Sequence, residues 1–155
     1  MERPVKVGAA VALSVIAIAL IALYFLGLPF RDWAWERMEI EAYDEIVLNF
    51  TDVPFPFNIT NHGGRDYANV TVLLRSLKEV LIFRDGTELP KRVIDGGLYS
   101  QYRIDIGPLR RGGGTRSIAL VVRSTLPSGS TTVVTITAYG DEKKLAEKDV
   151  KLIIP

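Results

Sequence analysis

The sequence contains no cysteine, only one histidine and only four asparagines in 155 residues. The missing thiols exclude disulfide bonds, thiolate metal sites and a cysteine nucleophile. His62 alone gives little material for a metal site, and no serine stands in a Gly-x-Ser-x-Gly setting. The sequence also has almost no net charge, because it contains 19 basic and 18 acidic residues. From the lack of catalytic and metal-binding residues, and from the balanced charge, we predict a protein that is not an enzyme and needs no cofactor. We also expect it to bind neither nucleic acid nor a small-molecule substrate.

Charge is absent from one long stretch, "VGAAVALSVIAIALIALYFLGLPF", at residues 7–30. As a helix, residues 7–28 would rise about 33 Å, which is close to the hydrocarbon thickness of a bilayer. Gly27 and Pro29 favour an end to the helix at that point. We therefore expect a cytoplasmic tail at 1–6, a transmembrane helix at 7–28 and contact with the lipid bilayer.

Aromatic residues follow the apolar stretch within a predicted linker at 29–36. Phe30, Trp33 and Trp35 stand beside charged residues there, which is typical of a membrane–water interface. A cleaved secretory signal is the alternative, but its apolar region is shorter, about 7–15 residues, and ends at an Ala-x-Ala-like site that this stretch lacks.

A third interpretation of the N-terminus is a filament subunit. The segment "RPVKVGAAVALSV" resembles the processing region of type IV pilins and archaellins, although Val7 stands where the archaeal version usually has a second charged residue. Gly8 and Ala12, and then Ala10 and Ser14, have the small-x-x-x-small spacing that allows close helix packing. This interpretation places the helix in the core of an assembly.

The pattern changes to β-strands after Trp35. Short runs rich in β-branched residues, such as "RMEIEAY", "FPFNIT", "ANVTVLLRSL", "LYSQYRIDIG" and "TTVVTITAYG", are separated by Gly, Pro, Asn and Asp. Pro54 and Pro56 indicate an edge strand or a bulge in their run. We predict an all-β fold over residues 37–155, an immunoglobulin-like β-sandwich of seven to nine strands.

Three of the four asparagines begin Asn-x-Thr triplets: Asn49, Asn58 and Asn69. This triplet is the acceptor for N-glycosylation, which takes place outside the cytoplasm. The triplets lie in one stretch of the sequence, so we expect used sites to coat one face. They also favour an orientation with a cytoplasmic N-terminus and an extracytoplasmic C-terminal domain at the cell membrane.

Two glycine-rich segments are predicted to form turns. "NHGGRD" makes His62 a solvated turn residue. "RRGGGTRS" lacks the lysine and the following helix of a phosphate-binding loop, so a hairpin turn is expected there.

Three longer segments, "FPFNITNHGGRDYANVTVLL", "IDIGPLRRGGGTRSIALVV" and "VVTITAYGDEKKLAEKDVKL", resemble CARDB-type and related immunoglobulin-like domains of archaeal or bacterial surface proteins. The resemblance covers roughly residues 50–153 and implies a seven-stranded sandwich for adhesion, spacing or assembly, with no catalytic set. The acidic end of that family's last strand is replaced here by "LIIP".

We expect a membrane-anchored module that contacts another envelope protein or its own copies. A subunit of a surface filament and an auxiliary subunit of a larger membrane complex remain the alternatives. Exposed strand edges or apolar loops would supply the contact. The candidates are Phe55 and Phe57 in the proline-bearing run and Ile153 and Ile154 in the last strand.

Overall fold

The computed structural model describes residues 15–21 and 36–155, and the chain divides into two units at residues 35 and 36. Residues 15–21, the described part of the predicted span, are helical. Among the residues that the structure describes, no helix is long and apolar enough to cross a membrane. Outside them lie the tail at 1–6, most of the predicted span 7–28 and nearly all of the linker 29–36. The candidates there are Gly8, Ala12, Ser14, Phe30, Trp33 and Trp35.

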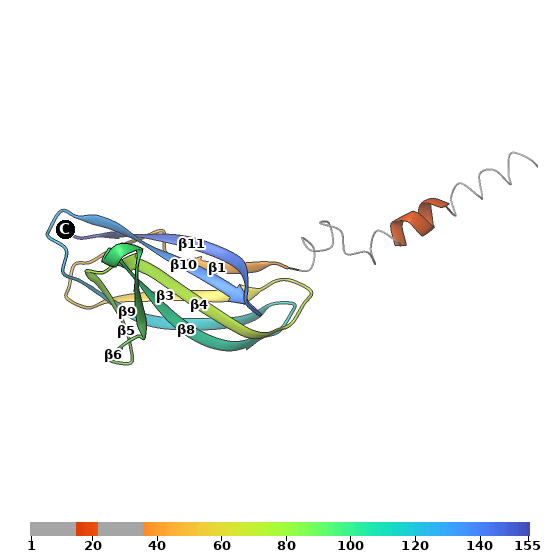
Figure 1. Ribbon diagram of the computed structural model, residues 1–155, viewed down its shortest axis with the longest axis horizontal. Helices are drawn as coiled ribbons and strands as arrows, with labels where there is room; N and C mark the ends of the chain where they lie inside the picture. The colour runs from red at the N-terminus through yellow and green to blue at the C-terminus, as the bar shows by residue number, and fades with distance from the viewer. Residues whose placement is uncertain (1–14, 22–35) are drawn as a thin grey trace, which may run out of the picture. The chain divides into compact units, whose positions relative to one another are not determined.

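The second unit is a β-sandwich of two sheets (Figure 1). Sheet I has the order β1-β3-β9-β5-β6, and sheet II has the order β2-β11-β10-β4-β8-β7. The strands are β1 Met38–Ala42, β2 Glu45–Val47, β3 Val53–Asn61, β4 Tyr67–Leu77, β5 Val80–Arg84, β6 Thr87–Glu88, β7 Lys91–Ile94, β8 Tyr99–Leu109, β9 Gly114–Ser124, β10 Thr131–Gly140 and β11 Lys143–Ile153, with a 3-10 turn η1 at Asp95–Gly97.

The first segment of the sandwich belongs to both sheets. β1 pairs antiparallel with β3 in sheet I, and after two residues β2 pairs parallel with β11 in sheet II. All other strand pairs are antiparallel. The segment at 38–47 therefore ties the two layers together along one side, which is an immunoglobulin-like arrangement.

Alternation along the strands places one face of each sheet in the core. In β3, Phe55, Phe57 and Ile59 are buried, and Val70, Val72 and Leu74 are their counterparts in β4. The buried residues of both sheets form one hydrophobic cluster. This period of two is the pattern from which the sequence predicted a sandwich, and that prediction is confirmed.

The expected strand number was too low. The described residues contain eleven strands instead of seven to nine, and the additional ones are short. β2 has three residues, β6 two and β7 four, which is too short for a clear alternation in the sequence.

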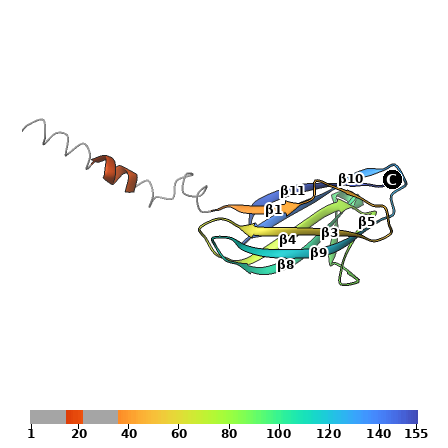
Figure 2. The same cartoon turned by 180° about the vertical axis from the view of Figure 1, so that it is seen from behind.

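The loops gather at two ends of the sandwich, which Figure 2 shows from behind. One end, which we call the neck end, contains the beginning of β1, the β3–β4 loop, and the β8–β9 and β10–β11 turns. Backbone hydrogen bonds from His62 N to Arg37 O and from Gly112 N to Gly63 O join these segments. The far end contains the β2–β3 loop, the β9–β10 loop and the C-terminus, where Leu48 N donates to Ile153 O.

Candidate interaction surface

The two aromatic residues proposed as partner contacts are core residues. Phe55 and Phe57 are only 1% and 2% exposed, and their rings pack edge to face with centroids 6.2 Å apart. The sequence correctly placed Phe55 and Phe57 on the opposite face of the strand from Pro54 and Pro56, but the phenylalanines point inward. The structure therefore corrects this prediction, because a partner cannot reach buried rings.

The last strand is not a free edge either. Lys151–Ile153 pairs with β10 on one side and with β2 on the other. Ile153 and Ile154 are half-buried, and Ile154 exchanges backbone hydrogen bonds with Gly129 and Ser130 of the β9–β10 loop. A partner strand therefore cannot add to this part of β11, contrary to the expectation of an exposed edge.

The outward face of sheet I divides into a polar half and an apolar half. Toward the neck end, register places Thr60 between Glu39 and Thr115, and Asn58 between Glu41 and Ser117. Toward the far end, Pro56 faces Ala119, and Val121 lies between Pro54 and Phe83. We call Tyr43, Pro54, Pro56, Phe83, Ala119 and Val121 the contact patch. Its members come from four separate segments of the chain.

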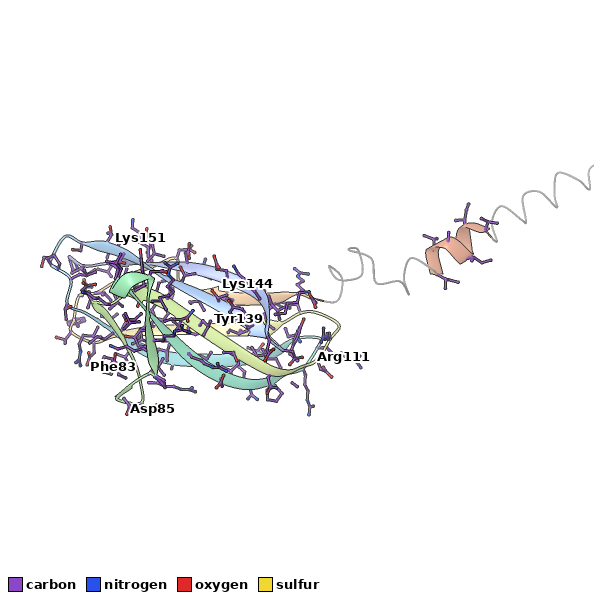
Figure 3. The ribbon with its side chains drawn as sticks, in the orientation of Figure 1. Phe83, Asp85, Arg111, Tyr139, Lys144 and Lys151 are labelled. Atoms are coloured by element: carbon purple, nitrogen blue, oxygen red, sulfur yellow. The ribbon has the colours of Figure 1, made fainter. Side chains whose placement is uncertain are left out.

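Rigid and aromatic side chains dominate the contact patch. Tyr43 is 64% exposed and borders a shallow hollow with Pro56 at the end of β1. At the other side, the Arg123 guanidinium lies 4.9 Å from the centroid of the Phe83 ring. Figure 3 labels Phe83 on β5, next to the projecting β5–β6 hairpin. Aromatic residues and arginine are the types that supply most of the energy in protein interfaces.

Asp52 holds Arg123 in place beside the contact patch. The Arg123 Nε and Nη2 atoms donate to the two carboxylate oxygens of Asp52, at 2.8 and 3.2 Å. These hydrogen bonds hold the pKa of Asp52 below its usual value and raise the pKa of Arg123. The pair stays charged at neutral pH, which keeps the guanidinium oriented over the ring.

The outward face of sheet II is different, because its polar groups bind one another. Thr71 donates to Asp105, Arg103 pairs with the same carboxylate at 3.1 Å, and Thr135 donates to Asp149. An open groove of about 760 Å³ crosses this face, with Tyr139, Leu73 and Asp141 among its lining residues. Apolar side chains also lie on this face, since Val133 is 45% exposed and lines a smaller hollow together with Leu77 and Tyr99.

His62 is a bonded residue rather than a merely solvated one. Its Nε2 atom lies 2.6 Å from Glu39 Oε2 on β1, and its backbone N–H donates to Arg37 O. The β3–β4 loop is thereby fastened to the first strand. The histidine was the one residue that raised the question of a metal or catalytic site, and its ring is occupied by a structural contact.

The glycine-rich turn at 112–114 also uses its N–H groups internally. Gly113 N donates to Asn61 O, and Gly114 N donates to Arg110 O. Gly112 and Gly113 have φ values of 71° and 108°, which only glycine adopts easily. The segment is a turn, as the sequence predicted, but not a hairpin, because it joins β8 of sheet II to β9 of sheet I. Its amides donate to the protein's own backbone.

The neck end is organised by a buried asparagine and an ion cluster. Asn61 Nδ2 donates to Arg65 O at 2.7 Å, and Asn61 Oδ1 accepts from Gly63 N at 3.0 Å. Glu36 accepts from Lys143 at 2.5 Å and pairs with Arg65 at 3.5 Å. Sequence reasoning missed the role of Asn61, which begins no acceptor triplet.

The three acceptor asparagines do not share one face, contrary to expectation. Asn49 lies in the β2–β3 loop at the far end and is exposed. Asn58 is half-buried on the outward face of sheet I, opposite Ser117. Asn69 belongs to β4 of sheet II near the neck end, where its N–H donates to Asp141. Neighbours in sequence are separated here because consecutive strands belong to different sheets.

Comparison with known proteins supports the fold. AvmM, which catalyses macrocyclization in alchivemycin A biosynthesis, matches with a TM-score of 0.50 and 9% identity, over 77% of this chain and 89% of that one. WR4, an MSP family member from C. elegans, has a TM-score of 0.45, with 12% identity over 77% and 99% of the two chains. The CARDB domain of the PF1109 protein from Pyrococcus furiosus has a TM-score of 0.38, with 15% identity over 77% and 93%. The latter two likenesses are too slight to carry an argument.

No family model and no curated protein matches the sequence. The resemblance to CARDB-type domains therefore holds only at the level of the immunoglobulin-like fold. The chain has an immunoglobulin-like β-sandwich fold.

Proposed function

We propose that the protein is a membrane-anchored, non-enzymatic module whose β-sandwich contacts another protein of the cell envelope. Residues 7–28 would hold it in the bilayer, with the tail at 1–6 in the cytoplasm and the sandwich outside. The uncharged stretch at 7–30 and the three Asn-x-Thr triplets support this orientation.

The contact patch is the observation that carries the proposal. It places two prolines, an alanine, a valine and two aromatic rings on the outside of a sheet, where exposed strand positions are usually polar. Burial of a proline or alanine side chain costs no rotamer entropy, and Tyr and Phe bury a large area for few rotatable bonds. Such a surface favours contact with a protein.

The side chains that could do chemistry have structural partners instead. His62 binds Glu39, and the glycine turn at 112–114 donates to the backbone of its neighbours. Among the described residues, no group of three metal-ligating side chains comes together. These contacts give His62 and the glycine turn structural roles in the sandwich.

The size of the contact patch argues for a partner held in the same membrane rather than for a stable complex of free chains. The patch has six members, whereas a standard interface takes about 20–30 residues from each partner. Tethering of both partners to one surface raises their effective concentration, so a small patch suffices.

The absence of cysteine allows a clean test. Ala119→Cys puts a single thiol in the contact patch, and Ser117→Cys puts one two residues away on the same exposed face. We expect a short thiol-reactive photo-crosslinker on residue 119 to give one dominant adduct with another envelope protein, and the residue 117 thiol to give at least fivefold less. Equal adducts from both positions, or a dominant adduct at twice the mass of the chain, would contradict the proposal.

A filament subunit is the second candidate, and the spacing of Ala10 and Ser14, which cleavage after Gly8 would leave in the chain, favours it. The mass of the mature N-terminus distinguishes the two. Cleavage after Gly8 would favour the filament, whereas an intact Met1 would favour the anchored module.

A further inference from the structure

The three acceptor triplets differ in the freedom of their threonine hydroxyl groups. Thr60 is only 8% exposed and shares a hydrogen bond of 3.0 Å with Thr115. Thr71 donates to Asp105 at 3.0 Å. Thr51 is exposed, and no hydrogen bond joins its side chain to another described residue. Since the triplet is recognised through this hydroxyl as well as through the asparagine, only Thr51 is available without breaking a contact.

The backbone of the triplets differs in the same way. Asn58 lies inside β3 with a partner strand on each side, opposite Glu41 and Ser117. Asn69 is fixed by the β10–β11 turn, since its N–H donates to the Asp141 carboxylate and its carbonyl accepts from Asp141 N. Asn49 follows β2 in an irregular segment, where its N–H donates to Val47 O two residues earlier rather than to another strand. A modifying enzyme has to draw the triplet into its own cleft, which an unpaired loop permits and a paired strand resists.

The loop that carries Asn49 is fastened at both ends and open between them. Leu48 N donates to Ile153 O at 2.8 Å, and Asp52 binds Arg123. Between these anchors, Phe50 is 79% exposed. The triplet Asn49-Phe50-Thr51 therefore projects from the far end of the sandwich.

From these contrasts we infer that Asn49 is the glycan acceptor of the folded chain, and that Asn58 and Asn69 are not modified once the sandwich has formed. The co-reactant is a sugar linked to a lipid diphosphate. The Asn49 Nδ2 atom forms a bond to the anomeric carbon, the bond from that carbon to the diphosphate oxygen breaks, and the amide nitrogen loses one proton to a base of the transferase. No oxidation or reduction is involved.

A glycan on Asn49 is compatible with partner binding at the contact patch. The role of this glycan in the cell rests on the proposed function. Asn58 and Ser117 form the outward-facing residue pair next to Pro56 and Ala119, so a glycan on Asn58 would cover the contact patch. A glycan on Asn49 is attached to a loop at the end of the sandwich, outside the face itself. One modification site and one contact surface can therefore function on the same molecule.

The test uses the purified full-length chain in detergent, an oligosaccharyltransferase and its lipid-linked donor. The transferase is one that modifies free peptides of the three triplets at comparable rates. We expect the folded chain to gain one glycan, with occupancy at Asn49 at least tenfold above that at Asn58 or Asn69. Asn49→Gln should abolish the gain, Asn58→Gln and Asn69→Gln should leave it unchanged, and the unfolded chain should be modified at all three positions.

Comparable modification of Asn58 or Asn69 in the folded chain would overturn the inference, and so would a folded chain that stays unmodified while the unfolded chain is accepted at Asn49. The assay is independent of the membrane and of any partner. Its failure is therefore distinguishable from failure of the proposed function, which crosslinking at residue 119 tests separately.

Discussion

The side chain of Asn61 donates a hydrogen bond of 2.7 Å to the backbone oxygen of Arg65, across the loop that joins β3 to β4. The same side chain accepts from Gly63 N, and the backbone oxygen of Asn61 accepts from Gly113 N. One buried residue thus connects the loop between the sheets with the β8–β9 turn.

Asn61→Ala should lower the free energy of unfolding by about 2–3 kcal/mol, because it leaves buried backbone groups without partners. The loss of the β-sheet circular dichroism signal on heating the full-length chain in detergent would measure this change. Asn49→Ala is the matched control and should change stability by less than about 0.5 kcal/mol. Equal effects of the two variants would contradict the role given to Asn61.

Glu142→Gly should stabilise the protein. Asp141 and Glu142 form the β10–β11 turn with φ values of 47° and 72°, a conformation that costs a side-chain-bearing residue about 1–2 kcal/mol. Part of the gain is offset by the greater freedom of glycine in the unfolded chain. We expect Tm to rise by about 2–4 °C.

The control for the turn is Gly86→Ala in the β5–β6 hairpin, where φ is 79°. It introduces the strain that Glu142→Gly removes and should lower Tm. A lower Tm for Glu142→Gly would show that the glutamate side chain has a stabilising contact that outweighs the backbone strain.

Alkaline pH should destabilise the sandwich through Tyr102. Burial raises the pKa of Tyr102 to about 12, and its hydroxyl donates to Val80 O at 3.1 Å. Because the folded state favours the neutral phenol, this stabilisation is fully present below pH 10 and is lost as the pH rises toward 12. Burial raises the pKa of Tyr67 in the same direction.

Unfolding midpoints measured in urea between pH 8 and pH 12 would test this dependence. Tyr102→Phe should be less stable at pH 8 by about 1 kcal/mol, from the lost hydrogen bond, and should fall less steeply at high pH. A parallel pH profile for the two proteins would contradict the assignment.

Pro54 and Pro56 should protect an open strand edge. β1 ends opposite Phe57, so no strand of sheet I covers residues 53–56 on that side. His62 N points to the β1 side, and alternation gives both prolines the same direction. The edge therefore offers carbonyl groups without N–H donors, which hinders pairing with another chain.

The double variant Pro54→Val and Pro56→Val restores those donors and should aggregate at lower protein concentration, with a measurable increase in sheet-specific dye binding. Pro127→Val, in the β9–β10 loop, should behave as the parent protein does. If the double variant remains as soluble as the parent, the prolines do not have this protective role.

Alternation of apolar residues predicted most strands and the sandwich, because apolar residues recur at every second position of each longer strand. The same alternation indicates that the apolar set of β3 points inward, so the prediction of Phe55 and Phe57 as partner contacts was at odds with it. Alternation could not show that Pro56 lies beside Ala119, since pairing between β3 and β9 joins residues far apart in the sequence. The contact between His62 and Glu39 was missed for the same reason.

Labelling of intact cells with a membrane-impermeant maleimide would show whether the sandwich lies outside the cytoplasm. The parent chain has no cysteine, so Ser117→Cys provides one reactive group on the sandwich and Glu2→Cys provides one in the predicted tail. An extracytoplasmic sandwich predicts that residue 117 is labelled in intact cells and residue 2 only after the cells are opened. Labelling of residue 117 only after opening the cells would contradict it.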